Sequence, residues 1–257
     1  MANWVRFNAG GNAGFGTLEG EEITVHEGCM FSGARPTGAR VALGDVQLDA
    51  PCAPTKIIAL WNNFHALAAK LGVAEPAEPL YLLKAPTTAA APGATVRRPP
   101  AYEGKTVYEG ELGIVIGKAA SNISEAEADA HIFGYTIVND ITAADILNKD
   151  PTFPQWARAK GFDAYGPFGP FITTQAPPDG AHIRTILNGA ERQNYAVGDM
   201  IFSPRRLVAM LSRDMTLLPG DLIACGTSLG VGSMKDAVNE VEVSIDGIGT
   251  LRNTFVQ

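Results

Sequence analysis

Residues 107–169 read VYEGELGIVIGKAASNISEAEADAHIFGYTIVNDITAADILNKDPTFPQWARAKGFDAYGPFG, and this stretch decides the fold and the chemistry that we expect. If its first part is an extended strand, side chains alternate between two faces. Glu109 and Glu111 then share one face with Gly113 and Gly117, while the opposite face is apolar. Because glycines leave room beside a strand, we expect the two carboxylates to line the wall of a pocket.

A third carboxylate follows a second apolar strand, which we predict over residues 133–140 (FGYTIVND). Asp140 ends this strand, a place where the backbone is fixed while the next turn leaves the side chain accessible. Thr142 and Asp145 have the spacing of a capping box, so we predict that Thr142 caps a short helix.

If Glu109, Glu111 and Asp140 converge, they form a site whose ligands are all oxygen atoms, which suits Mg²⁺ or Mn²⁺ better than zinc or copper. Without a cation, neighbouring carboxylates repel one another, and burial drives at least one of them to protonate. The alternative is that the two glutamates line a half-exposed strand and that Asp140 only caps a turn. The residue pattern by itself leaves both interpretations open.

The composition sets limits on the function. A chain of 257 residues, 46% hydrophobic, can bury the core of one catalytic domain with a small appendage. The net charge of −7 argues against nucleic acid or a membrane surface as the main partner. Three scattered cysteines indicate neither a disulfide framework nor a zinc site. Without a signal peptide or a long apolar run, we expect a soluble, cytoplasmic protein.

Turn signals divide the rest of the chain into short strands and a few helices. Residues 1–50 alternate short β-like runs with turn residues, which predicts a small antiparallel unit, and residues 51–257 then form the catalytic domain. This pattern indicates an α+β protein that is mainly β, and it excludes Rossmann and TIM-barrel folds. The main predicted elements are a strand at 56–60 with a helix closed by Gly72, a strand at 81–84, hairpin turns at 188–189 and 246–247, and a helix capped by Ser203.

Four ordered motifs resemble the fumarylacetoacetate hydrolase superfamily in its short bacterial form. The resemblance covers about residues 50–257 and implies a mixed β-roll catalytic domain, a small N-terminal β-rich domain and, as is usual in the family, a homodimer. The motifs are YEGELGIVIGK, FGYTIVNDITAAD, RAKGFDAYGPFGP and LPGDLIACGTSLGVG.

The resemblance also implies roles for individual residues. Glu109, Glu111 and Asp140 look like the carboxylates that bind Mg²⁺ or Mn²⁺ in the family. Lys160 looks like the catalytic lysine beside the metal and the substrate. The remaining assignments are Gly226 and Thr227 as holders of the substrate carboxylate, and Arg158 and Asp163 as neighbours that could orient the lysine.

His65 matches a histidine that activates water in the acylpyruvate hydrolases of the family. There a glutamate one turn later on the same helix orients the imidazole, but the corresponding residue here is Ala68. Either a glutamate from another loop replaces it, or the water-activating step is weakened. The second possibility favours a decarboxylase or an isomerase over a hydrolase.

Substrates in this superfamily are small linear carboxylic acids with a 2-oxo or enol core. A divalent cation can hold the carboxylate and the adjacent oxygen, and it stabilises the charge of an enolate. We therefore expect a metal-dependent carbon–carbon hydrolase of an acylpyruvate-like acid. One alternative is a decarboxylase or isomerase of a 2-oxo or 2-hydroxydienoic diacid. A further alternative is a binding or structural protein without catalysis, although the intact Glu109, Glu111, Asp140 and Lys160 argue against it.

Overall fold

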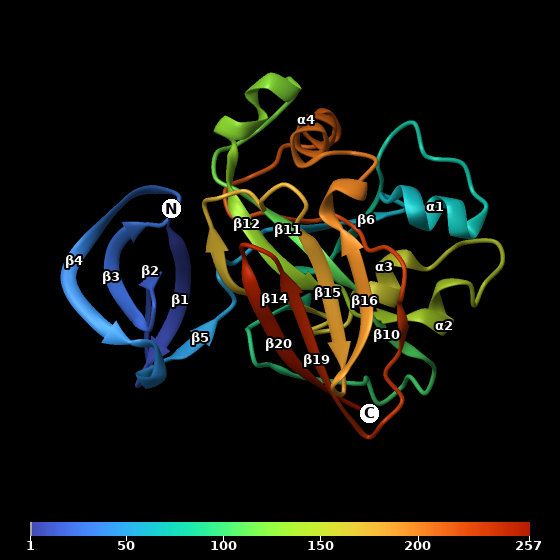
Figure 1. The fold of residues 1–257 in the computed structure, drawn as a ribbon, viewed down its shortest axis with the longest axis horizontal. Helices are drawn as coiled ribbons and strands as arrows, with labels where there is room; N and C mark the ends of the chain where they lie inside the picture. The colour runs from blue at the N-terminus through green and yellow to red at the C-terminus, as the bar shows by residue number, and fades with distance from the viewer. Residues whose placement is uncertain (1) are drawn as a thin grey trace.

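The computed structural model describes residues 2–257 and shows a mixed β protein with few helices (Figure 1). The strands are β1 (Asn3–Ala9), β2 (Asn12–Glu19), β3 (Glu22–Cys29), β4 (Ser32–Ala42), β5 (Gln47–Asp49), β6 (Ile57–Trp61), β7 (Leu80–Lys84), β8 (Ala89–Ala90), β9 (Thr95–Arg97), β10 (Thr106–Tyr108), β11 (Gly110–Ile116), β12 (Ile132–Asn139), β13 (Thr142–Ala143), β14 (Gly166–Thr173), β15 (His182–Leu187), β16 (Ala190–Ala196), β17 (Leu222–Ala224), β18 (Gly232–Ser233), β19 (Val238–Ile245) and β20 (Gly249–Val256). The α-helices are α1 (His65–Leu71), α2 (Ala144–Leu147), α3 (Trp156–Lys160) and α4 (Pro204–Asp214), and four 3₁₀-helices are η1 (Leu43–Asp45), η2 (Pro86–Thr88), η3 (Glu125–Ala130) and η4 (Val197–Asp199).

The strands form one large sheet and two smaller ones. The twelve-stranded sheet has the order β4-β3-β2-β1-β14-β12-β11-β17-β6-β7, with β5 and β8 paired to β1 and β14. A five-stranded sheet, β16-β15-β19-β20-β9, and a three-stranded sheet, β13-β10-β18, complete the fold. Most pairs are antiparallel, but β17 and β6 are parallel, as are β14 with β8 and β20 with β9. This mixed topology agrees with the predicted α+β roll and differs from both Rossmann and TIM-barrel folds.

The strand predicted at residue 107 is interrupted at Glu109, between β10 and β11. The expected alternation is nevertheless present, because Leu112, Ile114 and Ile116 lie together in the main apolar core while Val115 belongs to a second cluster on the other face. The helix predicted between the strand at 56–60 and Gly72 does not follow the strand directly and begins only at His65. Asn62, which precedes it, has a left-handed backbone (φ 57°) that cannot belong to an α-helix.

The expectation of open space beside the two glycines is wrong. A side-chain carbon on Gly113 would lie 2.8 Å from Val138 Cγ2, and one on Gly117 would lie 2.9 Å from Phe133 Cβ. Side chains of the neighbouring strand β12 therefore fill this space. The glycines allow two strands to pack closely, and they do not open a pocket.

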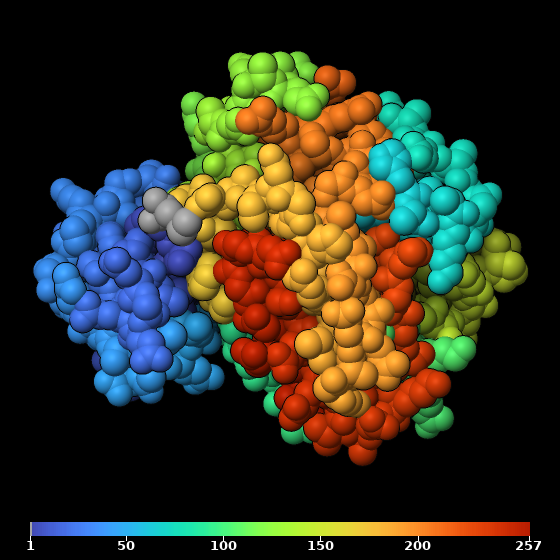
Figure 2. All heavy atoms as spheres, in the orientation of Figure 1, coloured from blue at the N-terminus to red at the C-terminus, as the bar shows by residue number. Residues whose placement is uncertain are grey.

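The N-terminal strands form a lobe beside the rest of the molecule (Figure 2). Strands β1 to β4 pair with one another in sequence order and antiparallel, as the turn pattern predicts. The pairing of β1 with β14, through Asn3 with Thr173 and Trp4 with Ile172, connects this lobe to the large sheet.

The two predicted hairpin turns and the predicted Ser203 cap are present. Asn188 and Gly189 both have positive φ and join β15 to β16, while Gly247 lies in the turn between β19 and β20. The Ser203 hydroxyl accepts a hydrogen bond from the Arg206 N–H at the start of α4. None of the helices within residues 2–257 has the length and apolar character that spanning a membrane requires.

Candidate metal centre

Three carboxylates from two paired strands meet at one point of the large sheet. Glu109 precedes β11, Glu111 is its second residue, and Asp140 follows β12 directly. Because Gly110 pairs with Asn139, the end of β12 lies beside the two glutamates, and the Asp140 N–H donates to the Glu109 carbonyl (2.8 Å). One oxygen atom from each of the three carboxylates lies within 4.8 Å of the other two. The antiparallel register therefore brings together residues that are about 30 positions apart in sequence.

The three carboxylates are unusually deep for charged groups. Glu111 and Asp140 are fully buried, and the side chain of Glu109 is 15% exposed. Burial raises the pKa of Glu111 well above its ordinary value, and the negative charge of Asp140 raises it further. Burial alone would also raise the pKa of Asp140, but the ammonium groups of Lys160 and Lys84 lower it.

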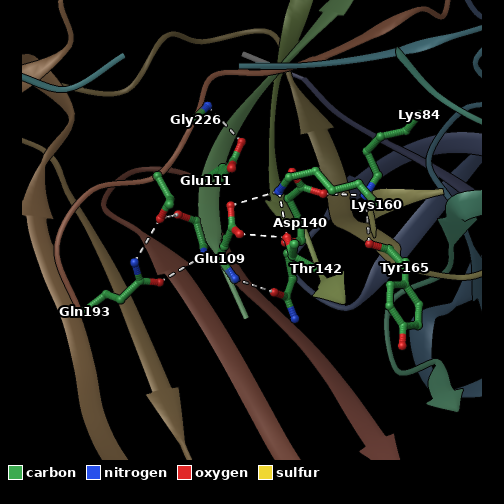
Figure 3. A network of polar contacts seen from close by, with 12 residues as sticks. Lys84, Glu109, Glu111, Asp140, Thr142, Lys160, Tyr165, Gln193 and Gly226 are labelled. Atoms are coloured by element: carbon green, nitrogen blue, oxygen red, sulfur yellow. Dashed lines mark hydrogen bonds and ion pairs between the residues drawn. The ribbon is translucent and has the colours of Figure 1, made fainter. Parts of the chain in front are cut away.

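Lys160 ends α3 with its ammonium group inside the carboxylate cluster (Figure 3). Its Nζ donates to Asp140 Oδ2, to Glu109 Oε2 (3.0 Å) and to Thr142 Oγ1 (2.8 Å). Although burial opposes the charged form, these carboxylates raise the pKa of Lys160, so it stays protonated. Arg158, a predicted orienting neighbour, is exposed and, within residues 2–257, forms no hydrogen bond to Lys160. The same holds for Asp163, the other predicted neighbour.

Lys84 is a site residue that the sequence did not reveal. It ends the edge strand β7, is buried completely, and donates through Nζ to Asp140 Oδ1 and to the Tyr165 carbonyl (3.2 Å). Burial lowers the pKa of Lys84 although Asp140 opposes this effect. A lysine that closes the apolar run YLL was the available signal, but sequence alone does not tell a buried lysine from an exposed one. With all five groups ionised, the two ammonium groups would offset two of the three carboxylates and leave one negative charge.

The role of Thr142 differs from the one that the sequence predicted. It does not cap a helix, since α2 begins after Ala143 without a side-chain cap. Instead the Thr142 hydroxyl donates to Glu109 Oε1 (2.7 Å) and accepts from Lys160. Asp145, the supposed capping partner, accepts from the Lys105 N–H. The short strand β13 pairs with β10, and this pairing directs Thr142 toward Glu109.

The residues of the cluster fit a hard divalent cation. Glu111 Oε2 accepts from the Gly226 N–H (2.8 Å), but its Oε1 is buried and has no hydrogen-bond partner within residues 2–257. A buried carboxylate oxygen without a partner is costly, and a cation removes that cost. Carboxylate oxygens are the ligands that Mg²⁺ and Mn²⁺ prefer. Glu109, Glu111 and Asp140 would hold the cation.

We expect Thr142→Val to weaken Mn²⁺ binding by about 10- to 100-fold, because groups that orient metal ligands typically contribute this much. The valine keeps a similar shape but removes the hydroxyl that contacts Glu109 and Lys160. Titration calorimetry with Mn²⁺ measures the affinity, and Thr142→Ser is the control that retains the hydroxyl. An affinity for Thr142→Val within twofold of the natural protein would contradict this role.

Gly226 and Thr227 lie next to the carboxylates, in the loop after β17. The backbone of Gly226 is left-handed (φ 89°), and its N–H contacts Glu111. The Thr227 hydroxyl is half-buried and lies 2.9 Å from Gln193 Nε2 and 3.2 Å from the Gly110 carbonyl oxygen. Both residues are therefore close enough to the carboxylates to contact the same small ligand.

His65 lies farther out, at the first residue of α1. Its side chain is 49% exposed, and its Nδ1 is 2.6 Å from Glu75 Oε1. Glu75, from the loop after α1, thus contacts the imidazole in place of the missing glutamate at Ala68. Within residues 2–257, no hydrogen bond joins His65 to the three carboxylates. The α1 start is nevertheless near them, since Asn63 donates to the Cys225 carbonyl (2.8 Å) beside Gly226.

A mixed β-roll with a cluster of three carboxylates that could hold a metal ion, two of them fully buried, and two buried lysines points to a known class of enzymes. The protein-family model "Fumarylacetoacetate (FAA) hydrolase C-terminal" matches residues 56–256, and the protein-family model "Rv2993c-like, N-terminal" matches residues 3–51. The chain therefore belongs to the fumarylacetoacetate hydrolase family, as its motifs predicted.

Named relatives carry out different reactions. The oxaloacetate tautomerase YisK of Bacillus subtilis is 34% identical over 253 residues, which cover 91% of this chain and 83% of YisK. The crystal structure of a 2-hydroxyhepta-2,4-diene-1,7-dioate isomerase from Mycobacterium marinum has a TM-score of 0.90, with 35% identity, 100% of this chain covered and 98% of that one. A maleylpyruvate hydrolase from Sphingobium sp. SYK-6, solved with manganese(II) and pyruvate, has a TM-score of 0.79, with 26% identity, 100% of this chain covered and 99% of that one.

Proposed function

We propose that this chain is a divalent-cation-dependent isomerase or tautomerase of a linear 2-oxo diacid, which acts through the enol or enolate form of its substrate. The observation that carries the proposal is the cluster of Glu109, Glu111 and Asp140 with two ammonium groups and a buried Glu111 oxygen that has no partner among residues 2–257. A cluster of this kind suits a hard cation and an oxygen-rich anionic ligand.

The chain's own residues divide the work. When bound, a divalent cation supplies positive charge that stabilises the substrate's enolate oxygen. Lys160, whose pKa is raised, adds a fixed ammonium charge at the same place. The Thr227 hydroxyl and the Gly226 loop hold the substrate carboxylate. His65, contacted by Glu75, is the candidate to exchange a proton with the substrate carbon, because histidine is the commonest general acid–base group.

The relatives favour proton transfer over hydrolysis. The tautomerase and the isomerase are 34% and 35% identical to this chain, whereas the hydrolase structure is 26% identical. Decarboxylation of a 2-oxo diacid needs the same enolate and stays an alternative outcome at this site.

A carbon–carbon hydrolase is the second candidate, and one contact supports it. Hydrolysis requires a base that activates water, and Glu75 can orient His65 for that step. Glu75 would therefore take the place of the orienting glutamate that is absent at position 68.

Product analysis separates these reactions. Purified protein with Mg²⁺ or Mn²⁺ is incubated with oxaloacetate and, separately, with an acylpyruvate. Loss of the enol absorbance of oxaloacetate without carbon dioxide supports the tautomerase; carbon dioxide with pyruvate indicates a decarboxylase. Release of pyruvate and a second acid from the acylpyruvate indicates the hydrolase. No cation-dependent conversion of either compound would contradict the proposal.

Substitutions of His65 and Glu75, which pair at the surface, then distinguish the candidate mechanisms. If the enzyme is a hydrolase, or an isomerase that moves the substrate proton through His65, we expect His65→Ala to lower kcat by about 100- to 10,000-fold, the usual range for general acid–base catalysis, and Glu75→Gln to lower it less. If decarboxylation is the main reaction, both variants should keep most of the activity. Glu78→Gln, an exposed glutamate in the same loop, is the matched control. Equal losses from Glu75→Gln and Glu78→Gln would contradict a role for the pair.

We further propose that residues 1–50 and 51–257 are two domains, that the partners are a small carboxylic acid and a second copy of the chain, and that Mg²⁺ or Mn²⁺ is the native cation. Light scattering of the purified protein measures the assembly, and a monomer at micromolar concentration would contradict the homodimer.

A further inference from the structure

Gln193 is a buried amide of β16 next to the carboxylates, and no sequence pattern pointed to it. Its side chain is 1% exposed, and both ends of the amide are fully bonded. Its Oε1 accepts from the Gly110 N–H (3.0 Å) and from the Thr185 hydroxyl (2.8 Å). Its Nε2 donates to Thr227 Oγ1 (2.9 Å) and to the Leu229 carbonyl (3.3 Å), as Figure 3 shows in part.

The neighbours permit only one orientation of this amide. The Gly110 N–H can only donate a hydrogen bond, and the Leu229 carbonyl can only accept one. A flipped amide would place two donors against each other at Gly110 and two acceptors at Leu229. Gln193 must therefore donate to Thr227, and the Thr227 hydroxyl must direct its own proton to an acceptor.

That acceptor can change without loss to the protein. In the structure the Thr227 hydroxyl donates to the Gly110 carbonyl oxygen (3.2 Å). The Tyr195 hydroxyl donates to the same oxygen, so this carbonyl keeps a partner if Thr227 turns away. The half-buried Thr227 is thus a donor that can turn to an anionic oxygen of a ligand.

Gln193 also acts on the backbone that carries the carboxylates. Gly110 is the residue between Glu109 and Glu111, and Gln193 and Tyr195 hold its N–H and its carbonyl. A side-chain carbon at Gly110 would lie 2.3 Å from Thr185 Oγ1, so the strand fits closely against this part of the second sheet. The orientation of this peptide sets how the two carboxylates diverge from the strand.

We propose that Gln193 is a positioning residue with two effects. It fixes the Thr227 hydroxyl as a hydrogen-bond donor toward the substrate carboxylate, and it holds the Gly110 peptide between two of the carboxylates. This inference rests on the proposed function, because it assumes a carboxylic acid ligand beside Thr227. It implies that the site selects a carboxylate, which only accepts, over a group that must itself donate there.

The test is pyruvate binding to the Mn²⁺-loaded protein, measured by calorimetry. In Gln193→Glu one carboxylate oxygen still accepts from the Gly110 N–H, but the other can only accept, so the Thr227 hydroxyl donates its hydrogen bond to residue 193 and not to the ligand. We expect the Kd for pyruvate to rise about 10- to 100-fold, the size of a lost hydrogen bond to a charged group. Mn²⁺ binding without pyruvate should not weaken. Asn194→Asp, the same change at the exposed neighbouring residue, should alter neither affinity.

A double-mutant cycle separates positioning from general damage. After Thr227→Val has removed the hydroxyl, Gln193→Glu should weaken pyruvate binding by less than about twofold, because both changes remove the same hydrogen bond. Losses that multiply would mean that Gln193 does not act through Thr227. If the buried charge prevents folding, Gln193→Met replaces it in the cycle, and this variant should also weaken Mn²⁺ binding about tenfold through the freed Gly110 N–H.

The outcomes also separate this inference from the proposed function. If the natural protein binds Mn²⁺ and pyruvate but Gln193→Glu binds pyruvate equally well, the role of Gln193 is wrong and the proposed function stands. If the natural protein binds no pyruvate in the presence of Mn²⁺, the proposed function is wrong, and the role of Gln193 falls with it.

Discussion

Glu111→Gln is expected to lose all divalent-cation-dependent turnover while the protein stays folded. Glutamine has the same shape, and its amide oxygen can keep the hydrogen bond from the Gly226 N–H. The substitution therefore removes a charge rather than volume. Groups that only orient metal ligands contribute about 10- to 100-fold to affinity, so the loss of a ligand should exceed about 100-fold. Calorimetry with Mn²⁺ and assays at saturating cation measure the two effects.

The same substitution should raise the melting temperature of the cation-free protein. Burial raises the pKa of Glu111, which means that its charged form is disfavoured when no cation is bound. Glutamine removes this penalty, so function and stability change in opposite directions. Glu240→Gln, an exposed glutamate of β19, is the control that should change neither property. A Glu111→Gln enzyme that kept full activity in excess chelator would refute the metal assignment.

Lys160→Met is expected to have the largest effect on the stability of the cation-free protein. Lys160 contacts both Asp140 and Glu109, and its removal leaves buried carboxylates that Lys84 alone cannot neutralise. Removing one partner of a buried ion pair typically costs about 3–5 kcal/mol. Activity should fall about 100- to 1,000-fold, the usual loss when one charge-stabilising group is removed. Urea unfolding and steady-state assays measure these changes.

Added cation should partly reverse the stability loss of Lys160→Met, because it supplies the positive charge that the lysine provided. We therefore expect Mn²⁺ to raise the melting temperature of the variant more than that of the natural protein. Lys149→Met, an exposed lysine of the loop before α3, is the matched control. Equal stability of Lys160→Met and the natural protein without cation would show that the ammonium group does not compensate the carboxylates.

Several local features followed from sequence because they depend on neighbouring residues alone. The alternation along residues 107–117 placed Glu109 and Glu111 on one face, and the structure keeps the apolar residues on the other. The Asn188-Gly189 turn formed as predicted because both residues accept positive φ. Ser203 capped α4 because its hydroxyl reaches the free N–H groups of the first turn.

Local patterns failed where a distant segment competed for the same group. Thr142 and Asp145 have the spacing of a capping box, yet each bonds a residue from another part of the chain. Gly113 left space beside the strand, but the side chain of Val138 from β12 filled it. For Thr142, long-range contacts outweighed a capping preference of about 1 kcal/mol.

The sequence by itself determined the extended stretch that carries Glu109 and Glu111, the family to which the chain belongs and the residues that could bind a hard cation. Only the tertiary structure decided which side chains contact the residues of the site. It pairs Lys84 with Asp140, Gln193 with the Gly110 N–H, and Glu75 with His65. The physical reason is that side-chain alternation is a property of the extended backbone, whereas these contacts depend on how separate strands and loops pack. No spacing in the sequence encodes that packing directly.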